Sequence, residues 1–156
     1  MTAPKGDSAF DVQAVKTAAG GLADVVLVDA PCSSLGTLRR GANVRWELTP
    51  EAILSTQFPE LQRAVLESAA ELVAVGGVLV YSTCTTVDQE NWQLAQAFSQ
   101  AHVDTFESSG LSEAWGSELA KAVCNAPGWE TQASVQLLPH KHQTDGFFIA
   151  RWRRIK

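Results

Sequence analysis

The sequence predicts an α/β fold with a mixed sheet, in which early strands are parallel and a later pair forms an antiparallel hairpin. Val25–Val28 is an apolar run that ends at Asp29 in a polar turn, and Gly76–Tyr81 repeats this arrangement. A single helical segment separates the two runs, and strand–helix–strand units of this kind give parallel, usually neighbouring strands. Two later apolar runs, Ser134–Leu138 and Gly146–Trp152, are close enough to pair as a hairpin.

The first strand is predicted to be covered on both faces. Its apolar residues follow one another without alternation, which is typical of strands in parallel sheets with helices on either side. Pro31 cannot donate a hydrogen bond to a neighbouring strand, so the strand must end near Asp29. Further upstream, Ser8–Val12 is a candidate for the tail of an earlier strand, with Asp7 or Asp11 at its exit.

The segment between the two runs has the features of a helix. Thr49-Pro50-Glu51 predicts its start, with a hydroxyl N-cap, a proline at the first helical position and an acid in the first turn. Pro59 removes a backbone donor, so we expect a kink or a restart there, and Gly76-Gly77 is expected to end the helix. Apolar residues at helical spacing define one buried face: Leu54, Phe58, Leu61, Val65, Ala69 and Leu72.

A second helix is expected after the second strand. Asp88 is its candidate N-cap, and Ala95 and Phe98 would face inward. Residues 103–132 have weak periodicity, and we interpret them as a short strand, loops and a helix near Glu113–Val123.

Length and composition restrict the class of protein. The 156 residues suffice for one domain with a core, and 46% hydrophobic and 19% charged residues are typical of a soluble globular protein. No apolar run approaches the roughly 20 residues that span a bilayer, and the N-terminus lacks an apolar signal-peptide core. The three cysteines form an odd set without metal-ligand spacing, so we expect neither a disulfide scaffold nor a metal site. We therefore expect a protein of the reducing cytoplasm that binds no membrane.

The sequence predicts that residues 1–156 form a partial domain, because it contains too few strands for a complete nucleotide-binding sheet. A doubly wound sheet that binds a nucleotide needs strands on both sides of its switch point. Here the first firm strand would be an uncovered apolar edge, and such edges favour association with another chain. The formal net charge of −5 argues against a general polyanion binder, although arginines gather after the first turn and at the end of the chain.

Two thiols are expected to converge where the strands end. In open α/β sheets the ligand lies beyond the carboxyl ends of the strands, and adjacent strands are about 4.8 Å apart. Cys32 and Cys84 would therefore leave the same edge of the sheet within reach of each other, with Asp29 beside them. Each thiol is in a polar turn and is a candidate nucleophile, or else simply a small buried residue. Cys124 is expected to be inert.

The sequence gives less support to four other kinds of site: a phosphatase loop, a cysteine–histidine pair, a metal site and a phosphate-binding loop. A phosphatase loop needs an arginine at the positions where this chain has Leu38 and Glu90, and nothing places a histidine base beside a thiol. The histidines of His140-Lys141-His142 are more typical of a solvent-facing loop than of metal ligands. A GxGxxG motif and a Walker loop are both absent from the sequence, which therefore predicts no phosphate cradle of its own.

Several motifs are shared with a known family. They are Asp29–Arg40, Val44-Arg45-Trp46, Tyr81–Cys84 with the following Glu90-Asn91, and Thr144–Phe148. From about Ala23 to Arg154 the chain resembles the Sun/Fmu (NOP/Sun-type) RNA cytosine-C5 methyltransferases, which include bacterial small-subunit rRNA enzymes. The resemblance implies a Rossmann-like fold that uses S-adenosylmethionine, of which this chain would be the C-terminal half.

The resemblance also implies catalytic roles. Cys84 would add to C6 of cytosine, which makes C5 nucleophilic enough to accept a methyl group. Cys32 would assist the elimination that follows, when C5 loses its proton or the product is released. Asp29 would hydrogen-bond the edge of the cytosine ring, and the target base would have to be unstacked first.

Binding roles are implied for a second set of residues. Pro31 would shape the turn, and Arg39 and Arg40 would contact the RNA backbone. The candidates for binding the cofactor are Asp7, Asp11 and Asp29.

The chain departs from the family in its upstream part. The cofactor-binding glycine motif, the strands before it and the RNA-binding domain have no counterpart in this sequence. We expect RNA, specifically rRNA, as partner, together with a complementary N-terminal half or a second copy that joins through the open edge. Two alternatives stay open: a truncated, non-catalytic half-domain that only associates, and a piece of a DNA cytosine-C5 methyltransferase, whose nucleophile corresponds to Cys32.

Overall fold

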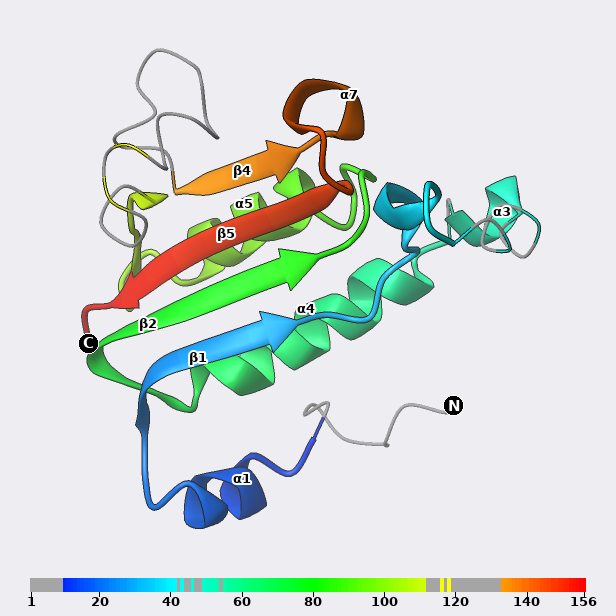
Figure 1. The fold of residues 1–156 in the computed structure, drawn as a ribbon. Coiled ribbons are helices and arrows are strands. Elements are labelled where there is room, and N and C mark those ends of the chain that lie inside the picture. The colour runs from blue at the N-terminus through cyan, green and yellow to red at the C-terminus, as the bar shows by residue number, and fades with distance from the viewer. Residues whose placement is uncertain are drawn as a thin grey trace.

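A computed structural model of the chain describes residues 10–41, 43, 46, 49–53, 55–111, 116, 118 and 133–156. Its elements alternate between helix and strand before ending in a hairpin (Figure 1). In order they are α1 (Val12–Ala18), β1 (Ala23–Asp29), the 3-10 turn η1 (Leu35–Thr37), α3 (Pro50–Ile53), α4 (Gln57–Ala70), β2 (Val73–Thr83), α5 (Trp92–Ala101), β3 (Phe106–Ser108), β4 (Ser134–Leu137), α7 (Pro139–His142) and β5 (Phe147–Arg154).

The sheet is mixed, as the sequence predicts. The strand order is β1-β2-β5-β3, and β4 pairs with β5 beyond the end of β3. Strands β1 and β2 are parallel neighbours, with Val28 opposite Tyr81, and β5 runs antiparallel to β2, β3 and β4. The last strand along the chain therefore occupies the middle of the sheet.

The core lies between the sheet and two helices on one of its faces. Helices α4 and α5 lie side by side behind the sheet in Figure 1. Phe98 of α5 packs against Trp152 of β5, with ring centroids 4.8 Å apart, and Leu66 of α4 and Leu79 of β2 are fully buried. In the described part of the chain, no helix is long and apolar enough to cross a membrane.

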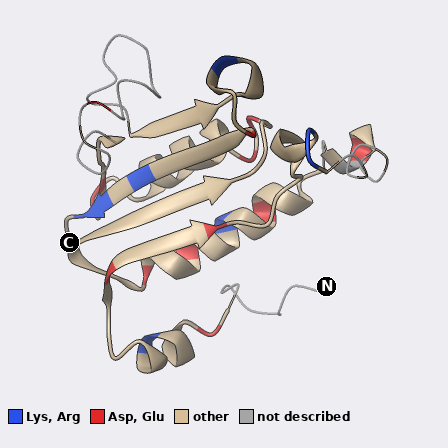
Figure 2. Ribbon diagram, viewed as in Figure 1, with Lys and Arg blue, Asp and Glu red and all other residues tan. Residues whose placement is uncertain are grey.

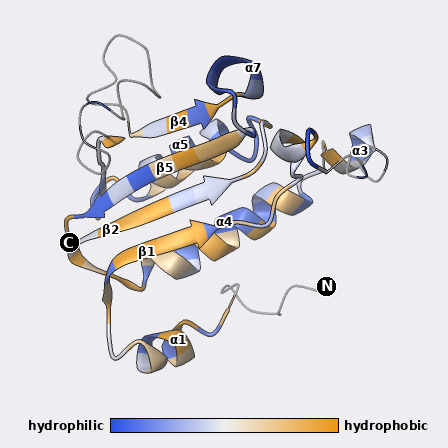
Figure 3. Ribbon diagram, viewed as in Figure 1, coloured by the Kyte–Doolittle hydropathy of each residue, from blue (hydrophilic) through white to orange (hydrophobic). Residues whose placement is uncertain are grey.

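The opposite face of β1 is open to solvent. The side chains of Val25 and Leu27 are 64% and 65% exposed, whereas Val28 is buried. No described helix covers this face, which is apolar along β1 (Figure 3). Within the part of the chain that the structure describes, the expectation that both faces of β1 are covered is therefore wrong, and the expectation that β1 is an apolar edge strand is confirmed.

Two boundaries differ from the expectations. Helix α4 ends at Ala70, and Gly76-Gly77 lies inside β2 instead of ending the helix, because Leu72 and Val73 already start the return to the sheet. The helix does restart near Pro59, since α3 and α4 are separate. Asn91, not Asp88, is the N-cap of α5, although the backbone carbonyl of Asp88 accepts from the N–H groups of Asn91 and Gln93 at the start of the helix.

The N-terminal expectation needs a correction as well. Phe10–Val12 is not a strand, because Asp11 is the N-cap of α1 and accepts a hydrogen bond from the backbone N–H of Ala14. Ser8 lies outside the described residues, as does most of the helix expected near Glu113–Val123.

The arginines at the end of the chain lie on β5 (Figure 2). Arg151 is buried and donates to the carbonyl of Gly110, and Arg154 donates to the carbonyl of Val73. These contacts tie β5 to neighbouring segments, so Arg151 and Arg154 stabilise the sheet.

Candidate functional site

The site is formed where β1 and β2 end next to each other. Both strands point to the same side of the sheet, toward η1 (Figure 1). The turn after β1 carries Cys32 and the turn after β2 carries Cys84, and their Sγ atoms are 3.3 Å apart. Both are free cysteines of intermediate exposure. The expectation that the parallel pair brings the two thiols together is confirmed.

Backbone contacts hold the two turns against each other at Gly36. Its N–H donates to the carbonyl of Cys84 at 2.9 Å, and its carbonyl accepts from the N–H of Gly146 at 2.8 Å. A Cβ at position 36 would lie 2.1 Å from the carbonyl oxygen of Gly146 and 2.7 Å from that of Cys84. Only glycine permits this approach of three segments, so the Gly at this position is what lets the turns meet.

A buried carboxyl group joins the Cys32 turn to the segment after Cys84. Glu90 is 1% exposed and accepts hydrogen bonds from the N–H of Ser33 at 3.0 Å and from its hydroxyl at 2.5 Å. The amide of Gln62 donates to Glu90 and also to the carbonyl of Pro31, both at 2.8 Å. Helix α4, the Cys32 turn and the start of α5 are thus joined through one carboxyl group.

The Cys84 turn is fixed by a second buried side chain, Asn91. Its side-chain oxygen accepts from the hydroxyl of Thr83 at 2.6 Å. Its amide donates to the carbonyl of Thr85 at 3.0 Å and to Gln136 of β4 at 2.8 Å. Because Thr83 and Thr85 flank Cys84, this amide sets the path of the backbone on both sides of the thiol.

Two groups at the site, the thiol of Cys32 and the hydroxyl of Tyr81, have raised pKa values. Burial, followed by the hydrogen bond with Cys84, raises the pKa of the Cys32 thiol to about 11. Burial and then the charge of Glu90 raise the pKa of Tyr81, whose hydroxyl donates to the carbonyl of Glu90. Cys32 is therefore protonated at neutral pH, and its sulfur lies against that of Cys84, where either thiol can be the donor.

Asp29 lies at the open end of β1. Its carboxyl group is exposed and accepts a weak hydrogen bond of 3.3 Å from the hydroxyl of Ser82 on β2. Pro31 follows it in the turn, exposed as well, with its carbonyl held by Gln62. The acid, the proline and the thiol predicted for this turn therefore lie together at the end of the strand.

The two predicted RNA-contacting arginines are held by an acid that the sequence reasoning did not single out. Arg39 lies 3.7 Å from a carboxyl oxygen of Asp145, and Arg40 forms a closer ion pair with the other oxygen. Asp145 is buried, whereas both arginine side chains are more than half exposed. The arginines thus anchor the loop to the hairpin and still present part of their guanidinium groups to solvent.

The predicted cofactor residues are not brought together. Asp7 lies outside the described residues, and the carboxyl group of Asp11 is engaged as the cap of α1. Asp29 alone stands at the carboxyl end of the sheet, where an α/β fold binds its ligand. Of the two described candidates, therefore, Asp29 lies at the carboxyl end of the sheet and Asp11 lies at the start of α1.

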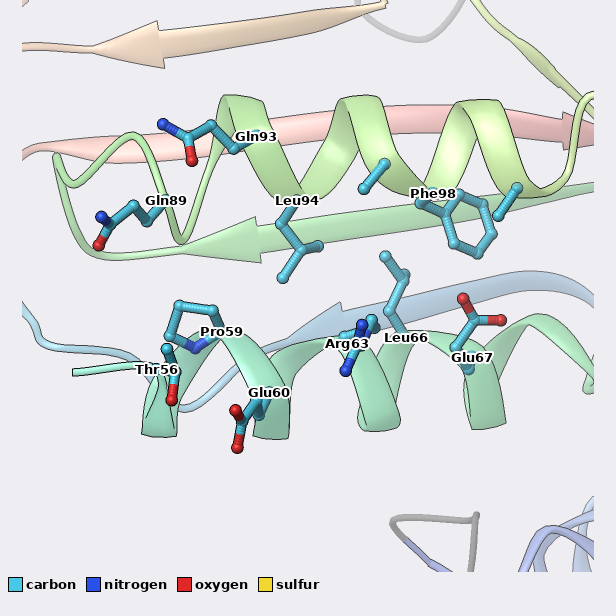
Figure 4. A pocket seen from close by; sticks show the side chains of 12 residues that line it. Thr56, Pro59, Glu60, Arg63, Leu66, Glu67, Gln89, Gln93, Leu94 and Phe98 are labelled. Atoms are coloured by element: carbon cyan, nitrogen blue, oxygen red, sulfur yellow. The ribbon is translucent and has the colours of Figure 1, made fainter. Parts of the chain in front are cut away.

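A groove lies away from the thiols. It runs between α4 and α5, has a volume of about 580 Å³ and includes Leu66, Leu94 and Phe98 on its floor (Figure 4). A smaller hollow of about 290 Å³ is lined by Trp92 and Trp152. Neither is lined by Cys32 or Cys84, so the two thiols lie outside both grooves.

Three structural members of the site carried no role in the sequence reasoning. Glu90 and Asp145 occur in shared motifs, but their sequence positions do not reveal that they are buried. Gln62 is a polar residue next to an apolar face of a helix, which usually indicates the solvent side. The signal available for Gln62 was its position one turn before Leu66, which is in the core.

Comparison with known proteins places this geometry in context. A family described as 16S rRNA methyltransferase RsmB/F matches residues 8–153. The probable ribosomal RNA small subunit methyltransferase B of Synechocystis is 41% identical over 137 residues, which are 85% of this chain and 28% of that protein. The ribosomal RNA small subunit methyltransferase F of Serratia proteamaculans is 33% identical over 84% of this chain and 26% of that protein.

Solved structures give the same result. NSun6 from Pyrococcus horikoshii, crystallised with the S-adenosylmethionine analogue SFG, superposes with a TM-score of 0.61 at 28% identity, over 94% of this chain and 34% of that one. The crystal structure of PH0851 gives a TM-score of 0.68 at 36% identity, over 84% and 26%. The chain thus spans only 26% to 28% of the length of these two curated relatives.

Proposed function

Because the chain belongs to the RsmB/F family of 16S rRNA methyltransferases, we propose that it carries the catalytic thiols for S-adenosylmethionine-dependent methylation of cytosine C5 in rRNA. The observation that supports this most directly is the pair of free thiols, Cys32 and Cys84, 3.3 Å apart at the carboxyl ends of adjacent parallel strands. The described elements would be part of one methyltransferase catalytic domain.

Cys84 is the proposed nucleophile. Its sulfur lies 3.3 Å from that of Cys32 and is partly exposed, so a flipped base can reach it. As a thiolate, Cys84 would add to C6 of the flipped cytosine, and the electron pair displaced toward C5 makes that carbon a nucleophile. S-adenosylmethionine, when bound, supplies the methyl group.

Cys32 and Asp29 are the proposed partners of Cys84. Asp29 is exposed at the strand end, where it can hydrogen-bond the edge of the cytosine ring and hold part of the cofactor. Cys32 lies within reach of the adduct and would assist the elimination, in which C5 loses its proton and the bond from Cys84 to C6 breaks. Pro31 would keep the turn in the shape that exposes both groups.

Arg39 and Arg40 are proposed to contact the RNA backbone. Their side chains are 58% and 69% exposed, so phosphate oxygens can reach them while Asp145 fixes the loop beneath. Guanidinium groups bind phosphate in a bidentate manner, which positions RNA without reading its sequence.

The test is covalent trapping by an RNA that contains 5-fluorocytosine. Fluorine at C5 blocks the final elimination, so a productive complex stays attached to the nucleophile and shifts the band on a denaturing gel. We expect trapping by the reduced chain with S-adenosylmethionine and by the Cys32→Ser variant, and none by Cys84→Ser. Cys124→Ser is the matched control. Trapping that survives in Cys84→Ser but not in Cys32→Ser would assign the nucleophile to Cys32, and trapping by DNA instead of RNA would favour a DNA methyltransferase.

The open side of β1 supports a second proposal, on assembly. Val25 and Leu27 are mostly exposed, and β1 has no described strand on its outer edge. We propose that a complementary strand-and-helix half covers this side and completes the sheet, in preference to a second copy of the chain. A two-fold dimer would pair β1 antiparallel with itself and leave the apolar face without a helix.

Sedimentation of the chain alone tests the proposal that a complementary half covers β1, because a stable homodimer would contradict it. A folded, monomeric chain that binds no S-adenosylmethionine by itself would place the cofactor site on the complementary half, and one that binds none even with that half would favour the non-catalytic half-domain.

We also assign the protein to the cytoplasm. Two free thiols at this distance stay reduced in a compartment buffered by thiol reductants. Localisation of a tagged chain by fractionation checks this assignment.

A further inference from the structure

The two thiols are placed for a reaction with each other. Their sulfur atoms are 3.3 Å apart, and a disulfide bond is about 2.05 Å long, so closure needs an approach of only about 1.3 Å. Both side chains are partly exposed, which allows a small oxidant to reach them.

The surrounding contacts keep this proximity. The hydroxyls of Ser33 and Thr85, which follow the two cysteines, are hydrogen-bonded at 2.7 Å. The N–H of Gly36 donates to the carbonyl of Cys84, so a side-chain and a backbone hydrogen bond join the two turns next to the thiol pair. Groups held in this way react as if they were present at very high concentration.

We expect Cys84, and not Cys32, to make the first attack on an oxidant. Burial raises the pKa of Cys32 to about 11, so this group is a thiol at neutral pH and a poor first attacker. The initial attack on an oxidant falls to Cys84, and Cys32 is the neighbouring thiol that can resolve the product. The hydroxyl of Ser34 lies 3.4 Å from the sulfur of Cys84 and adds a polar group to its surroundings.

We propose that Cys32 and Cys84 form a reversible intramolecular disulfide when the chain meets hydrogen peroxide. The sulfur of Cys84 attacks one peroxide oxygen, the O–O bond breaks, and the departing hydroxide takes a proton to leave as water. Cys32 then attacks the sulfenic sulfur of Cys84, the S–O bond breaks, and the hydroxyl leaves with the Cys32 proton as a second water. Two thiols are oxidised and one peroxide is reduced to two waters. A dithiol reductant reverses the bond by exchange.

The bond itself does not depend on methyl transfer. Its consequence for activity does rest on the proposed function, because neither sulfur of a disulfide can add to cytosine or assist elimination. The oxidised chain is then the inactive form, and its activity returns on reduction.

The experiment uses the Cys124→Ser chain, so that only the two thiols of the pair remain. Stoichiometric hydrogen peroxide should oxidise both thiols, so that the number of free thiols per chain falls from two to none. The intact mass should fall by the mass of two hydrogens. A peptide linking Cys32 to Cys84 should appear, and dithiothreitol should remove it. Adding Cys32→Ser should stop the reaction at a sulfenic acid on Cys84 that dimedone labels.

The outcomes separate this inference from the proposed function. A mass gain of oxygen atoms without a linked peptide, or links only between chains on a non-reducing gel, would overturn the disulfide while leaving RNA trapping by the reduced chain intact. Circular dichroism of each serine variant shows that a missing bond is not caused by unfolding. A chain that forms the bond but traps no RNA would confirm the inference and contradict the proposed function.

Discussion

Ser33 gives both its backbone N–H and its hydroxyl to the carboxyl group of Glu90, although 57 positions separate them in the sequence. Ser33 directly follows Cys32, and Glu90 lies in the turn that leads from Cys84 into α5. This contact therefore sets the distance between two strand ends that carry the thiols. Loss of it should change the site without removing either sulfur.

Glu90→Gln is expected to destabilise the chain by about 1–3 kcal/mol, because the new amide donor faces groups that already donate. The measurement is the free energy of unfolding in urea, together with the rate of disulfide formation by peroxide, which should fall. Glu71→Gln is the matched control, since Glu71 is exposed at the end of α4 and its replacement should change stability by less than about 0.5 kcal/mol. Equal stability of the two variants would contradict the buried network.

Gly36→Ala is expected to destabilise the fold by about 3 kcal/mol or more, because its Cβ would collide with two backbone carbonyls that cannot rotate away. Gly77→Ala is a matched comparison: its Cβ would lie 2.9 Å from the carbonyl oxygens of Ala74 and Asp24, far along the strands from the thiols. Both variants should lose stability in urea, but only Gly36→Ala should slow disulfide formation under conditions where the chain is folded. Equal thiol reactivity in the two variants would contradict the role given to Gly36.

Arg40→Ala is expected to weaken binding to RNA and to lower the slope of log affinity against log salt by about 0.7 to 1, the value of one phosphate contact. The measurement is fluorescence anisotropy with a labelled single-stranded RNA at several salt concentrations. Lys16→Ala on α1 is the control, because this lysine lies on a helix apart from the site. Asp145→Asn should strengthen non-specific binding, since it frees both arginines for phosphate. Identical salt slopes for Arg40→Ala and the control would remove Arg40 from the RNA surface.

Cys32 is expected to react slowly with iodoacetamide at neutral pH. A pKa of about 11 instead of 9.0 lowers the thiolate fraction roughly a hundredfold, and the greater nucleophilicity of the more basic thiolate recovers part of this, leaving the rate about tenfold below that of a free cysteine. The rate should rise with pH and level off only near pH 11. Alkylation of the Cys124→Ser chain followed by peptide mass spectrometry resolves the two sites. A plateau for Cys32 below pH 9 would contradict the effect of burial.

Val25→Thr combined with Leu27→Thr should leave the folded state nearly unchanged, because both side chains already face solvent and threonine suits a strand. The pair should lower any association through β1, as measured by sedimentation with a candidate complementary half. Val28→Thr on the covered face is the contrast, where burial of a hydroxyl should cost about 1–3 kcal/mol. Unchanged association in the double variant would locate the contact elsewhere.

The sequence was sufficient to predict what depends on local pattern and on strand adjacency. Apolar runs ending in polar turns located β1, β2 and the hairpin, and the parallel pairing then predicted the meeting of Cys32 and Cys84. What it did not predict depends on distant partners. The burial of Glu90 and Asp145 results from contacts with segments more than fifty residues away, and a polar residue gives no local signal of such a contact.

Two expectations differ from the structure for a similar physical reason: the cover on both faces of β1 and the helix end at Gly76-Gly77. The continuous apolar run of β1 was interpreted as a strand covered on both faces, whereas its outer face is open among the described residues. The run is consistent with a second layer, but it does not say which chain supplies that layer. Gly76-Gly77 was interpreted as a helix end, and it lies within β2, where Gly76 has a positive φ of 83°. Glycine marks an unusual backbone angle and not the kind of element that contains it.

The place of β5 has a consequence for synthesis of the protein. β5 is the last strand along the chain, yet it lies between β2 and the pair β3 and β4. While the chain emerges from the ribosome, β2 keeps an unpaired inner edge until residues 147–154 have appeared. The sheet therefore closes late, and a nascent chain stalled before Phe147 would expose the unpaired inner edge of β2 to chaperones and to other nascent chains.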